Sequence, residues 1–491
     1  MLQLDCSDLI LNHAWINNQK ISSSDGRTFP VEDPADGTIL ATLPDCGQVE
    51  AEAAATAAYA AFSTWRALLA KERAQYLQSW LSEIRKHAED LARLISLEEG
   101  KPLSESRGEV AYGAAYIEWF AEEAKRVYGD VIPEPAHGRR IIVTKEPVGV
   151  AAAITPWNFP IAMLARKIAP ALAAGCTVVA KPAEDTPLSA LALAFLAARA
   201  GIPAGVINVV PASRDRAASV VDPWLADSRV RKLSFTGSTP VGKHLARESA
   251  STLKRLSLEL GGNAPFIVFD DADLGAAVNG LIASKFRNAG QTCICANRIY
   301  IADGIYDAFA EKLLKAVSAL RVGRAGGDAE IGPLINARAV EKVERHIANA
   351  VAHGARVLLG GKRHALGRFF FEPTILADVD RTMDIACEET FGPVAPLFRF
   401  HSENEVMEAA NATPFGLAAY FYSRDLARVM RVSSQLQAGL VGANEGAIST
   451  ELAPFGGVKD SGYGREGSRY GIDEYLQTKY LCLGGLGAVK Y

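Results

Sequence analysis

A chain of 491 residues is long enough for two or three domains with large hydrophobic cores. Its net charge of −4 provides no bulk positive field, which disfavours nucleic acid and anionic lipid as partners. The seven cysteines are an odd number and include no C-x-x-C pair, so we expect no metal site, no disulfide framework and a reducing compartment.

The uncharged stretch 147–165 is long enough to cross a membrane, but its composition argues against a transmembrane helix. Pro147, Pro156 and Pro160 would each interrupt a continuous helix. The first eight residues carry two acidic side chains and no basic one, unlike a secretory signal or a transit peptide. We therefore predict a cytoplasmic protein in which this stretch forms a buried strand and a functional turn.

Two kinds of pattern follow one another along the chain. Residues 48–128 show alanine-rich helical periodicity, and a parallel-sheet pattern of short apolar runs alternating with helices begins near residue 148. A second alternating series follows Glu259, and we place a domain boundary at 259–262, where two glycines would let the backbone turn. The expected strands are 148–154, 177–180, 206–210, 232–235, 265–269, 298–301, 356–359 and 418–422. The expected helices are 50–62, 71–87, 105–128, 187–200, 274–286, 306–320 and 337–353.

Two glycine motifs resemble nucleotide-binding signatures without meeting their requirements. Residues 462–467 match G-x-G-x-x-G but no predicted strand precedes them, so we interpret them as a structural turn. Residues 237–244 nearly match the P-loop, but His244 occupies the position of the magnesium-binding hydroxyl, which disfavours an NTPase. The second motif still joins a strand to a helix, where free backbone N–H groups suit a phosphate, although an ordinary tight turn would look the same.

Lys181 and Glu184 come just after another predicted strand. Ligands of open α/β sheets bind beyond the carboxyl ends of the strands. A carboxylate at this position could accept hydrogen bonds from ribose hydroxyls and would repel a 2′-phosphate. The alternative is a surface pair that only solvates the edge of the sheet.

Three further stretches supply the groups needed to attack a carbonyl carbon and then hydrolyse an acyl-enzyme. Cys293, at the end of 286–293, offers a nucleophile. Glu259 offers a carboxylate base, and Asn158 offers a side-chain amide donor.

The chain resembles the aldehyde dehydrogenase superfamily over nearly its whole length, and within it the succinate-semialdehyde dehydrogenases. The resemblance rests on Phe-Thr-Gly-Ser at 235–238, Leu-Glu-Leu-Gly-Gly at 258–262, Gly-Gln-Thr-Cys at 290–293, Glu-Glu-Thr-Phe-Gly-Pro at 388–393 and Pro-Phe-Gly-Gly at 454–457. The closer likeness rests on 285–297 and 464–471.

The resemblance implies an α/β fold with three parts. A Rossmann-type NAD-binding domain would comprise 1–128 and 147–259. An α/β catalytic domain would comprise 260–470. Oligomerisation segments would comprise 129–146 and 471–491, giving a homo-oligomer, either a tetramer or a dimer.

The resemblance also assigns catalytic roles. Cys293 would form a thiohemiacetal with the aldehyde and then a thioester, and Asn158 would stabilise the developing alkoxide together with the Cys293 N–H. Such a donor lowers the barrier by roughly 3 kcal/mol. Glu259 would activate the hydrolytic water, helped by a pKa raised through partial burial. Lys167 and Glu466 match positions linked to proton relay.

For cofactor and substrate the resemblance indicates two further sets of residues. Glu184 favours NAD, since NADP-preferring relatives commonly have serine there. The implied cofactor-binding residues are Trp157, Lys181, Glu184, Gly237, Ser238, Leu260, Glu389 and Phe391. The implied binding residues for the far carboxylate of succinate semialdehyde are Arg166, Arg287 and Ser449, although each arginine could instead form an internal ion pair.

Several alternatives stay open at this stage. Glutarate semialdehyde is one methylene longer, and a pocket discriminates a methylene by only about 1–3 kcal/mol. A broader aldehyde dehydrogenase is also compatible. A non-catalytic nucleotide-binding member is disfavoured by the presence of Cys293 and Glu259, and a coenzyme A-acylating enzyme by Glu259. Cys295 could form a reversible disulfide with Cys293, as in some relatives with this pair, but closing so short a loop would need a local rearrangement and packing is the simpler explanation.

Overall fold

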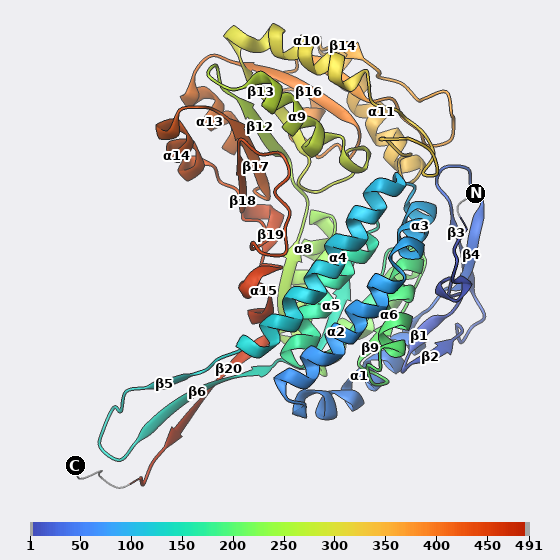
Figure 1. Cartoon of the computed structure of the whole chain (residues 1–491), viewed down its shortest axis with the longest axis vertical. Helices are drawn as coiled ribbons and strands as arrows, with labels where there is room; N and C mark the ends of the chain where they lie inside the picture. Colours follow the sequence, from blue (N-terminus) through green and yellow to red (C-terminus); the bar gives the residue numbers. More distant parts are fainter. Residues whose placement is uncertain (1–2, 487–491) are drawn as a thin grey trace.

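The computed structural model describes residues 3–486, which form two large, mainly parallel sheets and a smaller sheet that projects from the body (Figure 1). The mixed α/β fold predicted from the alternating patterns is confirmed. In spatial order the first sheet contains β19 (Gly462–Tyr463), β11 (Arg255–Glu259), β10 (Val230–Thr236), β7 (Val150–Ile154), β8 (Thr177–Lys181), β9 (Ile207–Val209), β1 (Ala14–Ile16) and β2 (Gln19–Ile21).

Helices cover both faces of the first sheet because its central strands are apolar on both sides. In β7, Ala151 and Ala153 pack into one core, while Val150, Ala152 and Ile154 pack into another. The helices of this half are α1 (Gln48–Ala67), α2 (Ala70–Lys86), α3 (Ala88–Glu99), α4 (Leu103–Glu123), α5 (Pro160–Ala174), α6 (Leu188–Arg199), α7 (Ala217–Ala226) and α8 (Thr239–Ser249).

The second sheet is parallel except for its edge strand. Its order is β14 (Arg356–Leu359), β15 (Thr374–Ala377), β16 (Val394–Phe400), β13 (Ala296–Ala302), β12 (Ala264–Val268), β17 (Ala418–Tyr422) and β18 (Leu440–Ala443), with β14 antiparallel to β15. The remaining helices are α9 (Leu274–Lys285), α10 (Tyr306–Val317), α11 (Ala337–Ala352), α12 (Asp384–Cys387), α13 (Glu403–Asn411), α14 (Leu426–Gln435) and α15 (Ser468–Asp473).

The third sheet forms an arm that extends away from both large sheets (Figure 1). It contains β5 (Asp130–Ile132), β6 (Arg140–Pro147) and β20 (Leu476–Leu483), with β20 antiparallel to β6 over eight residues. The predicted oligomerisation segments contribute these strands, and residues 487–491 of the second segment lie outside the described residues. A separate two-stranded sheet joins β3 (Thr28–Glu32) to β4 (Ile39–Pro44).

The stretch 147–165 forms the end of β6, the buried strand β7, a turn and the start of α5. Among residues 3–486, no helix combines the length and the apolar character that crossing a bilayer requires.

Of the two glycine stretches, 261–262 differs from the expectation and 462–464 agrees with it. Gly261 and Gly262 do not have positive φ; a Cβ at Gly262 would lie 2.5 Å from the Cys293 carbonyl oxygen, so close approach explains the glycine there. Gly462 and Gly464 do have positive φ, as a structural turn requires. Gly462 belongs to β19, which pairs with β11, so the chain rejoins the first sheet within the segment 260–470.

Replacing Gly462 by alanine tests this turn. Its φ is 107° and a Cβ would lie 1.9 Å from the Leu258 carbonyl oxygen, so Gly462→Ala is expected to lower the free energy of unfolding by about 2 kcal/mol or more. Gly108→Ala is the control, because this exposed glycine lies inside α4 with nothing within 4 Å of a Cβ. The control should raise stability by roughly 0.5–1 kcal/mol in denaturant unfolding. Equal stability of the two variants would contradict the assignment.

Candidate active site

One cavity of about 360 Å³ collects residues from both large sheets. Its walls come from the turns that follow β7, β10 and β11, from the start of α11 and from the loops before β13 and β16. The carboxyl ends of parallel strands are where α/β sheets bind ligands. The predicted site residues in its wall are Trp157, Asn158, Gly237, Ser238, Glu259, Leu260, Cys293, Glu389 and Phe391.

Cys293 lies in a loop whose backbone is strongly constrained. The preceding residues Asn288, Ala289 and Gly290 all have positive φ, and a Cβ at Gly290 would lie 2.1 Å from the Gly392 carbonyl oxygen. On the other side, the Tyr420 hydroxyl donates a 2.8 Å hydrogen bond to the Ile294 carbonyl. Burial raises the pKa of the Cys293 thiol to about 12, although the Arg166 guanidinium opposes the shift. The thiol therefore needs a base before it can attack.

Glu259 ends β11 and is 1% exposed. Neither carboxylate oxygen has a hydrogen-bond partner among the described residues. Burial, with the nearby Glu466 charge, raises its pKa well above the usual range. A Cβ at Gly456 would lie 2.9 Å from Glu259 Oε1, so a side chain there would crowd the carboxylate. A buried carboxyl group of raised pKa, in the same cavity as the half-buried Cys293 thiol, is a strong proton acceptor once it is ionised.

Asn158 follows β7, is 3% exposed and faces the same cavity. Its Nδ2 donates a 2.9 Å hydrogen bond to the Gln291 carbonyl, which anchors the amide to the loop that carries Cys293. An amide nitrogen has two hydrogens, so the second is available to a ligand.

Arg166, Lys167 and Glu466 form a fully or almost fully buried ion cluster next to this site. Glu466 is bound by the Arg166 Nε and, at 2.5 Å, by Lys167 Nζ. The internal ion pair considered for Arg166 is therefore present. Its Nη1 and Nη2 nevertheless have no hydrogen-bond partner among the described residues, which leaves two charged donors for a ligand.

None of the three residues predicted to bind substrate, Arg166 included, contributes to the wall of the cavity. The Arg287 guanidinium lies over the ring of Phe159, 4.7 Å from its centroid, and makes no ion pair among the described residues. Ser449 is half-buried in the irregular segment that follows β18.

The cofactor-facing side of the cavity combines an anion-binding terminus with aromatic walls. Ser238 occupies the N-cap position of α8, and the Trp157 and Phe391 rings meet edge to face with centroids 5.6 Å apart. Glu389 accepts a 3.2 Å hydrogen bond from the Gly262 N–H, and burial raises its pKa to about 7. A helix terminus for phosphate and a buried carboxylate for ribose hydroxyls fit a nicotinamide dinucleotide.

Lys181 and Glu184 lie apart from this cavity. Glu184 lines an adjoining cavity of about 280 Å³, which shares Arg214, Ile335 and Asn336 with the first. Lys181 is buried at the end of β8, and its Nζ donates a 3.2 Å hydrogen bond to the Pro182 carbonyl.

Three cationic residues in the wall of the larger cavity, and a histidine near them on α11, were not predicted from the sequence. Arg214, Arg338 and Lys342 all line the larger cavity. His346, one turn beyond Lys342 on α11, contacts Glu388 Oε2 at 3.1 Å and Thr390 Oγ1 at 3.2 Å, on either side of Glu389. The i, i+4 spacing of Arg338, Lys342 and His346 is a helical face that the sequence contains.

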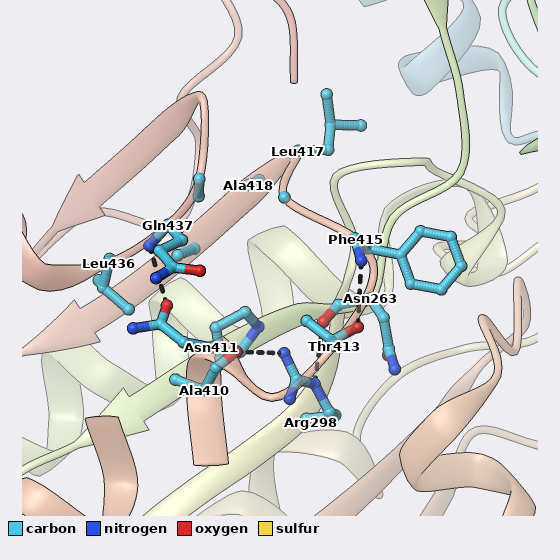
Figure 2. A pocket seen from close by; sticks show the side chains of 14 residues that line it. Asn263, Arg298, Ala410, Asn411, Thr413, Phe415, Leu417, Ala418, Leu436 and Gln437 are labelled. Carbon is cyan, nitrogen blue, oxygen red and sulfur yellow. Dashed lines mark hydrogen bonds between the residues drawn. The ribbon is translucent and has the colours of Figure 1, made fainter. Parts of the chain in front are cut away.

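Figure 2 shows a second hollow, where α13 meets β12 and β13. Its space is only about 10 Å³, room for about one water molecule. Arg298 is fully used there, because it donates to the Asn263, Ala409 and Ala410 carbonyls at 2.8–2.9 Å. We interpret this hollow as a structural junction.

The chain belongs to the aldehyde dehydrogenase family, whose model matches residues 21–481. Members of this family are enzymes that use a nicotinamide cofactor. The chain is 59% identical to 3-sulfolactaldehyde dehydrogenase from Pseudomonas putida, over 99% of this chain and 100% of that protein. It is 57% identical to succinate-semialdehyde dehydrogenase [NADP(+)] from Escherichia coli (strain K12), over 98% and 100% of the two chains.

Glutarate-semialdehyde dehydrogenase from Pseudomonas aeruginosa is 56% identical, over 99% of this chain and 100% of that protein. Among solved structures, an NADP-dependent enzyme from E. coli superposes with a TM-score of 0.97 and 57% identity, over 98% of this chain and 100% of that one. The family and fold predicted from the sequence motifs are confirmed.

The pH dependence of Cys293 alkylation tests the electrostatics of the free site. Because the thiolate is the reactive form, the rate with iodoacetamide should keep rising with pH towards about 12, as far as the protein stays folded. Peptide mass mapping would follow Cys293 alone, with free glutathione as the reference thiol. A plateau near neutral pH would contradict the raised pKa.

Proposed function

We propose that this protein oxidises small aldehydes that carry an anionic group at the far end, with succinate semialdehyde as the leading substrate and succinate as its product. The buried Arg166 guanidinium carries the proposal, because its two terminal nitrogens have no partner among the described residues. Arg166 is paired with Glu466 through its Nε, but buried N–H donors without an acceptor are costly, and an anionic substrate would satisfy the two terminal nitrogens. Arg287 and Ser449 are proposed to complete the binding of the anion.

The proposed chemistry uses Cys293, Asn158 and Glu259. The Cys293 thiol passes its proton to the ionised Glu259 carboxylate, and the sulfur attacks the aldehyde carbon to give a tetrahedral adduct whose alkoxide oxygen is held by Asn158 Nδ2 and the Cys293 N–H. A bound nicotinamide cofactor would supply hydride acceptance, which would leave a thioester on Cys293. Once Glu259 has released its proton it takes another from water, and the resulting hydroxide releases the carboxylate product. Lys167 and Glu466 are proposed to pass that proton onward.

Two other anionic aldehydes are specific rivals as the substrate. The relative of 59% identity is named for 3-sulfolactaldehyde, and another relative is named for glutarate semialdehyde. All three candidate substrates combine an aldehyde with a sulfonate or carboxylate. The arginine geometry supports this shared class and does not by itself choose a member.

For cofactor we propose NAD, with NADP as the alternative. Glu184 supports NAD, since a carboxylate repels a 2′-phosphate. Arg214 opposes that argument, because it lines both cavities and could offset the carboxylate charge. A relative named for NADP(+) keeps the alternative open.

A comparison of aldehydes tests the proposed substrate class. NADH or NADPH formation would be followed with succinate semialdehyde, glutarate semialdehyde, 3-sulfolactaldehyde and uncharged butanal, using each cofactor in parallel. Arg287→Gln should lower kcat/KM for the anionic aldehydes by about 10- to 100-fold through KM, and leave butanal almost unchanged, because a hydrogen bond to a charged group contributes roughly 1.5–3 kcal/mol.

Two controls accompany this test. Cys293→Ser should abolish turnover of every aldehyde, while Arg424→Gln, on the exposed surface, should change none of them. If butanal were the best substrate of the wild-type protein, the anionic-aldehyde proposal would fail. A strong preference for NADP would overturn the Glu184 argument alone.

We further propose that the β5–β6–β20 arm joins copies of this chain into a homo-oligomer in a reducing, cytoplasmic setting. The arm exposes large apolar side chains that a monomer would leave in water, among them Val131, Ile132, Tyr480 and Leu481. All seven cysteines are free, which is compatible with a reducing compartment.

Charge placed on the arm tests the proposed association. Val131→Lys combined with Tyr480→Lys should shift the protein towards the 52.4 kDa monomer in light scattering, because buried unpaired charges destabilise an interface. The control is Leu426→Lys, an equally exposed apolar position on α14. An unchanged mass of the arm variant would refute this role.

A further inference from the structure

Lys101 lies in the Gly100-Lys101-Pro102 segment between α3 and α4, and its side chain is completely buried. Its Nζ donates a 2.6 Å hydrogen bond to the backbone carbonyl of Asn158. The same nitrogen donates at 2.7 Å to Glu109 Oε2 and lies 4.0 Å from the centroid of the Phe159 ring. A buried ammonium is therefore centred on the turn that carries the proposed oxyanion donor.

Glu109 connects this ammonium to the helix that follows the turn. Its Oε1 accepts hydrogen bonds from the Ile161 and Ala162 N–H groups at 2.9 and 3.3 Å, at the start of α5. The carboxylate thus satisfies free N–H groups of the first turn and complements the helix dipole. Lys101 and Glu109 together fix the turn at Asn158 and the start of α5.

A second contact holds the same carbonyl from the side of the nucleophile. Asn288 Nδ2 donates a 3.0 Å hydrogen bond to the Asn158 carbonyl, and the Asn288 N–H donates to the Glu105 carboxylate at 2.9 Å. Asn158 makes a second contact with the loop of Cys293, because its own Nδ2 donates a hydrogen bond to the Gln291 carbonyl. The turn at Asn158 and the loop of Cys293 are therefore tied together at two points.

We propose that Lys101 is a positioning residue, which fixes the Asn158 amide at the distance from Cys293 that stabilising the thiohemiacetal oxygen requires. The proposal rests on the proposed role of Asn158. Four observations support it: complete burial of the ammonium, its short bond to the Asn158 carbonyl, its pairing with Glu109, and the shared carbonyl that Asn288 also binds. Electrostatic stabilisation depends on such pre-organised donors, and small displacements reduce it strongly.

The test is a double-mutant cycle on kcat at saturating aldehyde and NAD. Asn158→Ala is expected to lower kcat by about 100- to 1,000-fold, as removal of an oxyanion donor does. Lys101→Met should lower kcat by about 10- to 100-fold, with KM for aldehyde and NAD changed by less than about threefold. Because Lys101 acts through Asn158, adding Lys101→Met to Asn158→Ala should cost less than about twofold more.

Two further variants separate positioning from stability. Lys101→Met combined with Glu109→Gln removes the ammonium together with the carboxylate nearest to it, and leaves the buried Glu99, 3.8 Å from Lys101 Nζ, in place. The double variant should fold even if the single change does not. Lys254→Met is the matched control, since Lys254 is also a buried lysine that binds two backbone carbonyls, those of Asp227 and Val230, away from the cavity. The control should lower Tm and leave kcat unchanged.

The outcomes are distinguishable. If Asn158→Ala kept full kcat, the proposed role of Asn158 would fail and the positioning role with it. Suppose instead that Asn158→Ala lowered kcat, and that adding Lys101→Met lowered kcat by the same further factor as it does in the wild-type protein. The oxyanion role would then stand, and the positioning proposal would be overturned. A loss of kcat in Lys254→Met equal to that in Lys101→Met would likewise reduce Lys101 to a general stabilising residue.

Discussion

Glu466 lies between Arg166 and Lys167, and this buried cluster holds the segment that returns from the second sheet against α5. The two cations come from α5 beside the first sheet, and the carboxylate comes from the stretch between α15 and β19, which pairs with β11 of the first sheet. Breaking a buried pair by removing one partner is strongly destabilising, so this segment cannot leave α5 without a large cost. The Arg166 guanidinium also lies over the ring of Phe455, which packs in the core of the second sheet, so the cluster contacts both halves.

The removal of the reacting groups from water determines the chemistry of the site. Burial raises the pKa of Cys293 and of Glu259, so the free site favours a neutral thiol and a protonated carboxyl group. A carboxyl group in this state cannot accept the thiol proton, so Glu259 must first lose its own proton; the carboxylate is then a strong base for the thiol. Lys101 and Tyr420 do not touch the reacting atoms. They hold the turn at Asn158 and the loop of Cys293 in place through hydrogen bonds to backbone carbonyls.

Much of the architecture could be predicted because its signals are local. The alternation of apolar runs and helical patterns predicted parallel sheets, and the strands at β7, β8, β10 and β12 begin or end within about two residues of the expected positions. Strands β11, β15, β16 and β18 escaped prediction, since short buried strands show no alternation when both faces are covered.

The sequence by itself determined the chemical groups and the family, since the motifs around Glu259, Cys293 and Glu389 are contiguous. Tertiary structure decided what lies opposite those groups, because contacts between distant segments have no local signature. It paired Arg166 with Glu466, placed Glu184 in an adjoining cavity, and brought Lys101 to the Asn158 carbonyl across 57 positions of the chain. It also decided that Gly262 serves close packing against Cys293 and not a turn, which depends on a neighbour 31 residues away that only the folded chain supplies.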